Sequence, residues 1–406
     1  MRGAALGLVV AGGDGPLDAL GVPGDVALTP FGGKYRFIDF ALATLVNSGV
    51  NAVYVAAPHS SMLAAHLDRA AQGVQALRRP FPVRLAGAAG STRRATRLLR
   101  GLLGCRHFFE AHAPDVVVAL AADHILQLDT RDLVHAHRAR GGDLTLCTVS
   151  LPLDDMAGRA VLRTTDGSRV REAAPAPAHG PIPIRHQPFA VTWTGDLVVS
   201  GAVLPALFAA LPDDVQGDDA ELLDGLARAL HVAVYDVRDN SVPGAFHRQG
   251  AFWHEPTTLE VYYEAQMNLC TPSPALDLYN AAWPVLPVAS GLGPAKVVAD
   301  AAGRAGQALN SLVSDGAVIR GGVVVNTVVG HGVVVESGAE VEDSVLLDGC
   351  RVGRGARVRR AVVGAGAVIG DADEIGYGTS PAAPARVVRS GLTIVPSARP
   401  AIGGPR

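Results

Sequence analysis

A glycine-rich loop near the amino terminus could bind phosphate. The stretch AGGDGP, residues 11–16, follows a short apolar run that predicts a buried strand. Backbone amides in such a loop can surround a phosphate group, and the residues that would supply them are Ala11, Gly12, Gly13 and Gly15. An ordinary turn fits the same residues, and the negative charge of Asp14 beside any phosphate favours the turn.

A carboxylate at the end of another apolar run is the second candidate. Residues 115–122, DVVVALAA, predict a buried strand that brings Asp123 and His124 to its carboxyl end. Ligands of open α/β sheets bind at that edge, so Asp123 could take part in binding. An ordinary strand-end carboxylate is the alternative.

Arginines form a third cluster. Arg93, Arg97 and Arg100 recur at helical spacing, with Arg94 adjacent, so one helix face could bind an anionic effector. Charge clusters of this kind more often face solvent or another subunit, and we favour that interpretation. The cysteines and histidines show no spacing typical of a zinc or redox site.

The composition bounds the class of protein. The chain has 406 residues, 49% of them hydrophobic, and a formal net charge of −3, which predicts a globular protein of two domains that does not bind nucleic acid. No segment approaches the ~20 apolar residues of a membrane span, so we expect no membrane association. Residues 3–13 resemble a signal-peptide core but end in GGDGP instead of a cleavage site, so we expect a cytoplasmic protein.

Two kinds of pattern follow one another along the chain. First, apolar strands alternate with amphipathic stretches such as residues 35–46, which indicates a parallel sheet with crossover helices. We assign residues 1–270 to this α/β domain, with a proline-rich excursion at 173–188, and residues 271–307 to a connecting segment. In residues 308–406 an aliphatic residue recurs every sixth position between small residues, which predicts a parallel β-helix with a carboxyl-terminal tail.

Four stretches, in order, resemble the glucose-1-phosphate adenylyltransferase family. FGGKYRFIDFAL (31–42), followed by NSGV, is similar to the family's FGGKFRIIDFAL and NSGI, and AADHI (121–125) is similar to its GDHIY segment. Residues 258–284 resemble the segment before the family's β-helix, and residues 308–329 resemble the start of that β-helix. The resemblance implies a Rossmann-like nucleotidyltransferase domain followed by a left-handed parallel β-helix.

The same resemblance implies a reaction and its ligands. The family joins glucose 1-phosphate to the AMP part of ATP, which gives ADP-glucose for glycogen synthesis and releases pyrophosphate. Two anionic substrates must meet, so Mg²⁺ and positioned Lys and Arg side chains have to neutralise charge in the transition state. We therefore expect ATP or ADP-glucose and a sugar phosphate as ligands, Mg²⁺ as cofactor, and a homotetramer or a hetero-oligomer with an active homologue.

The chain departs from the family at the cationic positions. The family's glycine loop contains an arginine, whereas AGGDGPL is one residue shorter and has no arginine between Gly15 and Leu17. Val26 stands where the family has a catalytic lysine, and Ala174, on a loose alignment, stands where it has the lysine that binds the sugar phosphate. The family's GTADAV is replaced by STRRAT, residues 91–96.

The metal-binding positions are closer to those of the family. Asp123 retains its place and Glu255 stands where an aspartate coordinates Mg²⁺, so the resemblance implies that both hold the metal and that residual catalysis depends on Asp123. The extra methylene of Glu255 shifts its carboxylate, and we expect weak metal binding. Arg36 lies where the family binds phosphorylated sugar effectors; a surface arginine is the alternative.

Two functional hypotheses remain. The first is a weakly active or inactive homologue that acts as a regulatory or assembly subunit, and the second is a working adenylyltransferase with an atypical active site. The number of Lys and Arg side chains that the fold brings to the phosphate site distinguishes them. Acyltransferases also contain hexapeptide β-helices, but they lack the FGGKYRFIDFAL domain and are excluded.

Overall fold

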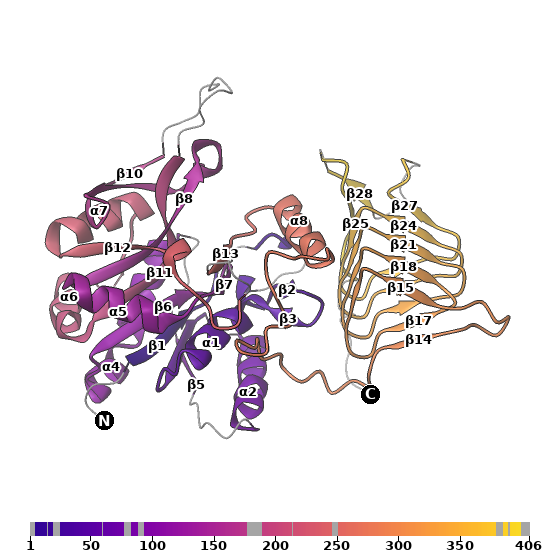
Figure 1. Ribbon diagram of the computed structural model, residues 1–406, viewed down its shortest axis with the longest axis horizontal. Helices are drawn as coiled ribbons and strands as arrows, with labels where there is room; N and C mark the ends of the chain where they lie inside the picture. Colours follow the sequence, from indigo (N-terminus) through magenta and orange to yellow (C-terminus); the bar gives the residue numbers. More distant parts are fainter. Residues whose placement is uncertain are drawn as a thin grey trace.

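The molecule consists of an α/β domain and a stack of short strands, which lie side by side and are joined by an extended segment (Figure 1). This computed structural model describes residues 5–13, 15–18, 25–58, 60–76, 83–87, 93–176, 189–212, 214–245, 251–378, 385–388 and 390–398. Asp14, Ser91, Thr92 and most of the proline-rich excursion lie outside the described residues.

A nine-stranded sheet forms the centre of the α/β domain. In spatial order its strands are β5 (Val83–Gly87), β4 (Val53–Ala57), β1 (Ala5–Val10), β6 (Val116–Ala121), β11 (Phe189–Ser200), β8 (Leu144–Pro152), β12 (Val232–Asp236), β10 (Arg169–Pro175) and β9 (Ala160–Thr165). The first four are parallel, whereas β11 is antiparallel to both of its neighbours and β9 pairs with β10 as a hairpin. The prediction of a parallel sheet holds for these four strands and for the β8–β12 pair. It is wrong for β11 and β10, which run antiparallel to their neighbours; β9 and β10 are joined by a tight turn without a crossover helix.

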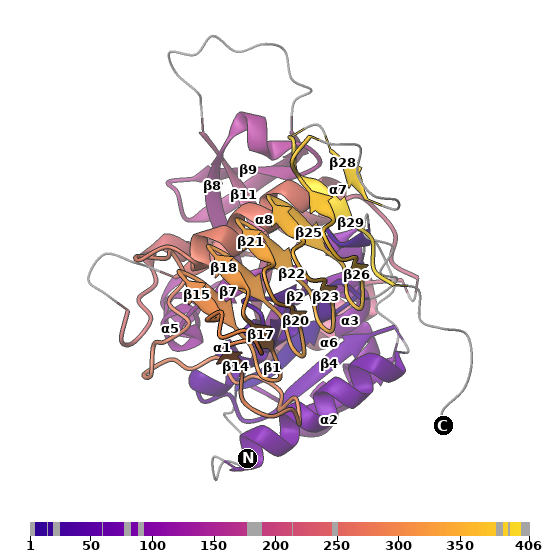
Figure 2. The same ribbon diagram turned by 90° about the vertical axis from the view of Figure 1, so that its right-hand side faces the viewer.

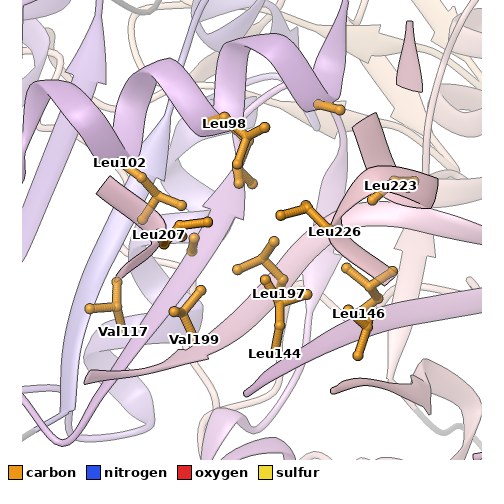
Figure 3. Close-up of a cluster of buried hydrophobic side chains, with 14 of the residues drawn as sticks. Leu98, Leu102, Val117, Leu144, Leu146, Leu197, Val199, Leu207, Leu223 and Leu226 are labelled. Atoms are coloured by element: carbon orange, nitrogen blue, oxygen red, sulfur yellow. The ribbon is translucent and has the colours of Figure 1, made fainter. Parts of the chain in front are cut away.

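Helices cover both faces of this sheet. One face carries α3 (Arg94–Gly104), α4 (Arg106–His112), α6 (Leu204–Ala210) and α7 (Asp219–Ala229); the other carries α1 (Phe37–Asn47), α2 (Ser61–Ala76) and α5 (Thr130–Arg140). Leu98, Leu207 and Leu226 lie over the side chains of Leu197 and Val199 on β11 (Figure 3). Since α3 and α7 share this core, their first turns meet: the Ala95 amide donates to Asp219 Oδ1 at 2.8 Å. Among the described residues no helix has the length and apolar character needed to cross a membrane.

The carboxyl-terminal domain is a left-handed parallel β-helix whose strands stack in three sheets (Figure 2). The first sheet contains β14 (Lys296–Val298), β17 (Val318–Arg320), β20 (Val334–Val335), β23 (Arg351–Val352) and β26 (Val368–Ile369). The second contains β15 (Gln307–Leu309), β18 (Val323–Val325), β21 (Glu340–Glu342), β24 (Arg357–Arg359) and β27 (Glu374–Ile375). The third contains β16 (Leu312–Val313), β19 (Val328–Val329), β22 (Val345–Leu346), β25 (Ala361–Val363), β29 (Thr393–Val395) and β28 (Arg386–Val387).

The hexapeptide positions form the inside of this β-helix. Ile319, Val335, Val352 and Ile369 stack in register on successive coils and are buried. Strand β14 already pairs with β17, so the first coil begins inside the segment 271–307 that the sequence analysis assigned to the connection. The six-residue pattern is too short in this first coil to be recognised from sequence.

A cluster of aromatic side chains joins the two domains. Phe31, Phe37 and Phe40 are buried against one another and share a core with Val328 and Leu347 of the β-helix. Phe31 belongs to β2 (Pro30–Phe31), which pairs with β3 (Tyr35–Arg36) through a tight turn. The FGGKYRFIDFAL stretch is therefore the surface on which the β-helix rests.

Glycine is required in that turn. Gly33 has a φ of 79°, and a Cβ at this position would lie 3.1 Å from the carbonyl oxygen of Val329 and would collide with Ser314 Oγ. The β-helix thus approaches the backbone of the α/β domain directly.

Candidate functional site

The glycine loop follows β1 and is turned back on itself. Gly12 and Gly13 have φ values of 109° and 107°, which side-chain-bearing residues rarely adopt. The Gly12 amide donates to Asp25 Oδ1 at 2.9 Å, and the same oxygen accepts from the Ala27 amide at 3.0 Å. Burial raises the pKa of Asp25. The Gly15 amide donates to Asp18 Oδ2 at 3.2 Å, and the Ala11 amide donates to the carbonyl oxygen of Ala56 at 2.9 Å. Three of the four amides proposed to cradle phosphate are thus engaged by groups of the protein itself, two of them by side chains.

Arg97 lies directly over this loop. A Cβ at Gly13 would be 2.6 Å from Nη1 of Arg97, so the guanidinium occupies the space beside the loop backbone. Arg97 is only 3% exposed, and its guanidinium pairs with Asp123. The interpretation that the arginine cluster faces solvent or another subunit is wrong for Arg97, because a buried carboxylate compensates its charge.

Strand pairing brings Asp123 and Glu255 together. Asp123 follows β6 and closely precedes β7 (Ile125–Gln127), while Glu255 directly follows β13 (Phe252–His254). β7 and β13 are antiparallel, with His254 opposite Ile125. The structure therefore places the two carboxylates, which the sequence separates widely, at one site.

Arg94, at the start of α3, lies between the two carboxylates. Its Nε donates to Asp123 Oδ2 at 3.1 Å, and its Nη2 donates to Glu255. Glu255 also pairs with Arg159, whose Nη2 lies 2.7 Å from Glu255 Oε2. All four side chains are at most 14% exposed, so this is a buried ion-pair network.

His124 forms hydrogen bonds with Asp123 and with a second carboxylate. His124 contacts Asp123 Oδ1 through Nδ1 at 2.9 Å and Asp196 Oδ2 through Nε2 at 3.0 Å. Burial alone lowers the pKa of His124, but the charge of Asp196 and the hydrogen bonds to both carboxylates outweigh it and raise the pKa to about 9. His124 is therefore a cation at neutral pH.

The charges in the network stabilise one another. Burial opposes ionisation of Asp123 and Glu255, but the neighbouring Arg94, with Arg97 and Arg159, holds the pKa of both carboxyl groups below its ordinary range. Burial likewise opposes the charge of Arg94, and the two carboxylates raise its pKa nonetheless. All three groups are ionised at neutral pH.

These groups line a pocket of about 430 Å³ at the carboxyl edge of the sheet. Its arginines are Arg93, Arg94, Arg97 and Arg159, and its carboxylates are Asp123, Asp218, Asp219 and Glu255. The pocket is thus lined by equal numbers of positive and negative side chains. Val26, which the resemblance to the family predicts to stand at its lysine position, lies on the wall of the pocket. Ala174 lies on β10 opposite Val161, next to the pocket-lining Ala160.

The carboxylates do not fit a Mg²⁺ ion in this arrangement. Mg²⁺ requires oxygen ligands at 2.0–2.1 Å in octahedral geometry, whereas Asp123 and Glu255 are bonded to the guanidinium that lies between them. Within the described ranges, no three His, Cys, Asp or Glu side chains form a group that could hold a metal. The assignment of Asp123 and Glu255 as metal ligands therefore stays a prediction, and the geometry of the two side chains does not favour it.

Arg36 lies away from this pocket, at the boundary between the domains. Its Nη2 pairs with Asp348 of the β-helix, and its Nη1 donates to the carbonyl oxygen of Tyr35 at 3.2 Å. The Arg36 side chain is 19% exposed. The residue predicted to bind an effector thus already has an internal anionic partner.

Sequence reasoning missed the roles of Arg94 and Arg159. The STRRAT string placed Arg94 at a position of interest, but the expected charged surface gave no reason to connect it with Asp123. Arg159 had no sequence signal at all, because only the fold brings the start of β9 to Glu255.

Comparisons with known proteins identify the family. A nucleotidyl transferase model matches residues 6–173, and a GlmU-like C-terminal hexapeptide model matches residues 293–395. A glucose-1-phosphate adenylyltransferase of Frankia casuarinae is 35% identical, with 88% of each chain covered. The chain belongs to the glucose-1-phosphate adenylyltransferase family. Members from Parafrankia sp. (32% identical, 90% of each chain) and Corynebacterium diphtheriae (31%, 91% of this chain and 87% of the relative) are similarly related.

Proposed function

We propose that this adenylyltransferase homologue transfers adenylyl groups weakly or not at all, and that it acts as a regulatory or assembly subunit. One observation carries the proposal: Arg97 lies between the glycine loop and Asp123, and Arg94 lies between Asp123 and Glu255. Catalysis of phosphoryl transfer requires cations that point at the phosphates. Here the arginines point at carboxylates of the same chain.

Charge balance supports this proposal. A triphosphate entering the pocket would meet as many lining carboxylates as arginines. To use Arg94 or Arg97 it would have to break ion pairs that are largely buried, and separating such pairs leaves costly unpaired charges. The valine at position 26 offers no replacement charge.

The β-helix supports an assembly role. Large apolar side chains are exposed on its first and last coils: Leu309 is 61% exposed and Val368 is 70% exposed. Exposed apolar groups of this kind and open strand edges favour burial in an interface. We propose a homo-oligomer, such as a homotetramer, or a hetero-oligomer with an active relative.

A working adenylyltransferase with an atypical site is the second candidate. The observation that favours it is that the fold brings four arginines to one pocket, which a phosphate-binding enzyme needs. In that case ATP and glucose 1-phosphate would be the substrates and Mg²⁺ would bind only where the arginines leave carboxylate oxygens available. An effector at Arg36 would have to displace Asp348.

One experiment separates these candidates. ADP-glucose formation is measured with ATP, glucose 1-phosphate and Mg²⁺ for the purified chain alone and after mixing with an active relative, and light scattering gives the mass of each sample. We expect little turnover alone, and a mixed oligomer with an altered response to sugar phosphates. Ordinary turnover by the chain alone supports the second candidate, and a monomer that ignores the relative contradicts the subunit role.

A further inference from the structure

We propose that Arg94 is a built-in cation that takes the place of a divalent metal between Asp123 and Glu255, so that these carboxylates bind a divalent ion only when Arg94 is removed. The inference rests on the proposed function in one respect, namely that the native site does not use Mg²⁺. It concerns binding alone, so it is tested without turnover.

The two carboxylates hold one guanidinium as ligands hold a metal. They come from different parts of the chain and are fixed by the β7–β13 pairing, and both bond to Arg94. The charge of Arg94 lies where a divalent ion shared by the pair would lie. The Arg94 guanidinium and a metal ion exclude each other there, because Arg94 fills the space between the two carboxylates and like charges repel at this distance.

The backbone is shaped to admit Arg94. Gly195 lies in the irregular part of β11, between Trp193 and Leu197, with a φ of 109°. A Cβ at this position would be 2.7 Å from Cδ and 3.0 Å from Nε of Arg94. A side chain at residue 195 would push Arg94 out of place, so the glycine and the arginine form one fitted unit.

Removal of Arg94 should leave the rest of the site in place. Asp123 keeps its contacts with Arg97 and His124, and Glu255 keeps its pair with Arg159. Each carboxylate therefore remains ionised and positioned, while the space between them is open to water and a cation. Mn²⁺ and Mg²⁺ bind such sites through one or two carboxylates and several waters.

In the experiment Mn²⁺ is titrated into the protein, and electron paramagnetic resonance measures the concentration of free Mn²⁺ at each step. The proteins are the native chain, Arg94→Ala, Arg94→Gln and the control Arg100→Ala, which changes an arginine of the same helix that pairs with Asp214 and does not line the pocket. Circular dichroism identifies the variants that fold, and Gln keeps the length of the side chain if Ala does not. We expect the folded Arg94 variants to bind Mn²⁺ about tenfold more tightly than the native chain or more, because a unit charge close to the ion is gone.

A double variant assigns the site. Arg94→Ala with Asp123→Asn should lose the gained affinity, since one of the two carboxylates is then neutral. Native protein that binds Mn²⁺ as tightly as the Arg94 variants overturns the proposal, and so do folded variants without any gain. A gain that survives Asp123→Asn places the ion elsewhere and also overturns it.

Discussion

The domain interface and the pocket are both buried, but they are stabilised in different ways. At the interface, Phe31 and Phe40 pack against valines and leucines of the β-helix, and the sequence is close to the family's motif. In the pocket, Arg94 and Arg97 pair with Asp123, and the sequence departs from the family. Apolar burial stabilises the interface, whereas ion pairs between charged side chains stabilise the pocket.

The largest expected effect is at the interface. Phe40→Ala removes a ring that is 1% exposed and contacts Phe31 and Tyr35, and the truncation of a buried Phe costs about 3–5 kcal/mol of unfolding free energy. Urea unfolding measures this loss. Met62→Ala, at a side chain that is 67% exposed, should change stability by no more than about 0.5 kcal/mol.

Asp123→Asn tests how the pocket is stabilised, because the two possible roles of Asp123 predict changes of opposite sign in the unfolding free energy. As the partner of Arg94, Arg97 and His124, Asp123 is stabilising, and its neutralisation should cost about 3 kcal/mol of unfolding free energy. If Asp123 and Glu255 instead formed a metal site without its metal, the same change would relieve repulsion between the two carboxylates and stabilise the protein. Asp214→Asn, at an exposed ion pair, should cost less than about 1 kcal/mol.

The pocket should also make stability depend on pH. A histidine whose pKa rises to about 9 on folding contributes stability that is complete below its unfolded value of about 6.5 and is lost as pH rises through 9. The unfolding free energy of the native chain should therefore fall between pH 6.5 and pH 9, by up to about 3 kcal/mol. His124→Asn should remove this slope, whereas His107→Asn, at a side chain that is 94% exposed, should retain it. Equal slopes in both variants would contradict the assignment.

The smallest expected effect is at the polar edge of the interface. Asp348→Asn weakens the pair with the partly exposed Arg36, and we expect a loss of about 1 kcal/mol in thermal or urea unfolding. If Arg36 binds a sugar phosphate, the same variant should bind it more tightly because Arg36 is released. Calorimetry with fructose bisphosphate as the probe measures this, and weaker binding by Asp348→Asn would argue against an effector site at Arg36.

The sequence was sufficient to predict the two domains and the β-helix. Local patterns are strong in both: the buried run at 115–122 and the six-residue repeat through Val335 and Val352 depend only on neighbouring residues. The antiparallel placement of β11 between β6 and β8 and the first coil at β14 were missed, because both depend on pairings between distant segments.

The candidate site was predictable only in outline. Asp123 and Glu255 were expected to act together, and the β7–β13 pairing does bring them to one site. Their partner was not predictable, because a guanidinium and a metal ion satisfy the same carboxylates and no sequence spacing distinguishes them. The burial of Arg97 depends on the fold in the same way.

The initial rate of ADP-glucose formation by the isolated protein tests the central claim most directly. Saturating ATP, glucose 1-phosphate and Mg²⁺ are supplied, and product is followed over hours. The loss of two positioned cations, each worth ~10²-fold, lowers an ordinary rate of about 10 s⁻¹ to about 10⁻³ s⁻¹ or less. A turnover of about 1 s⁻¹ or more would show that the arginines of the pocket leave their carboxylates to serve the substrate, and would contradict the account.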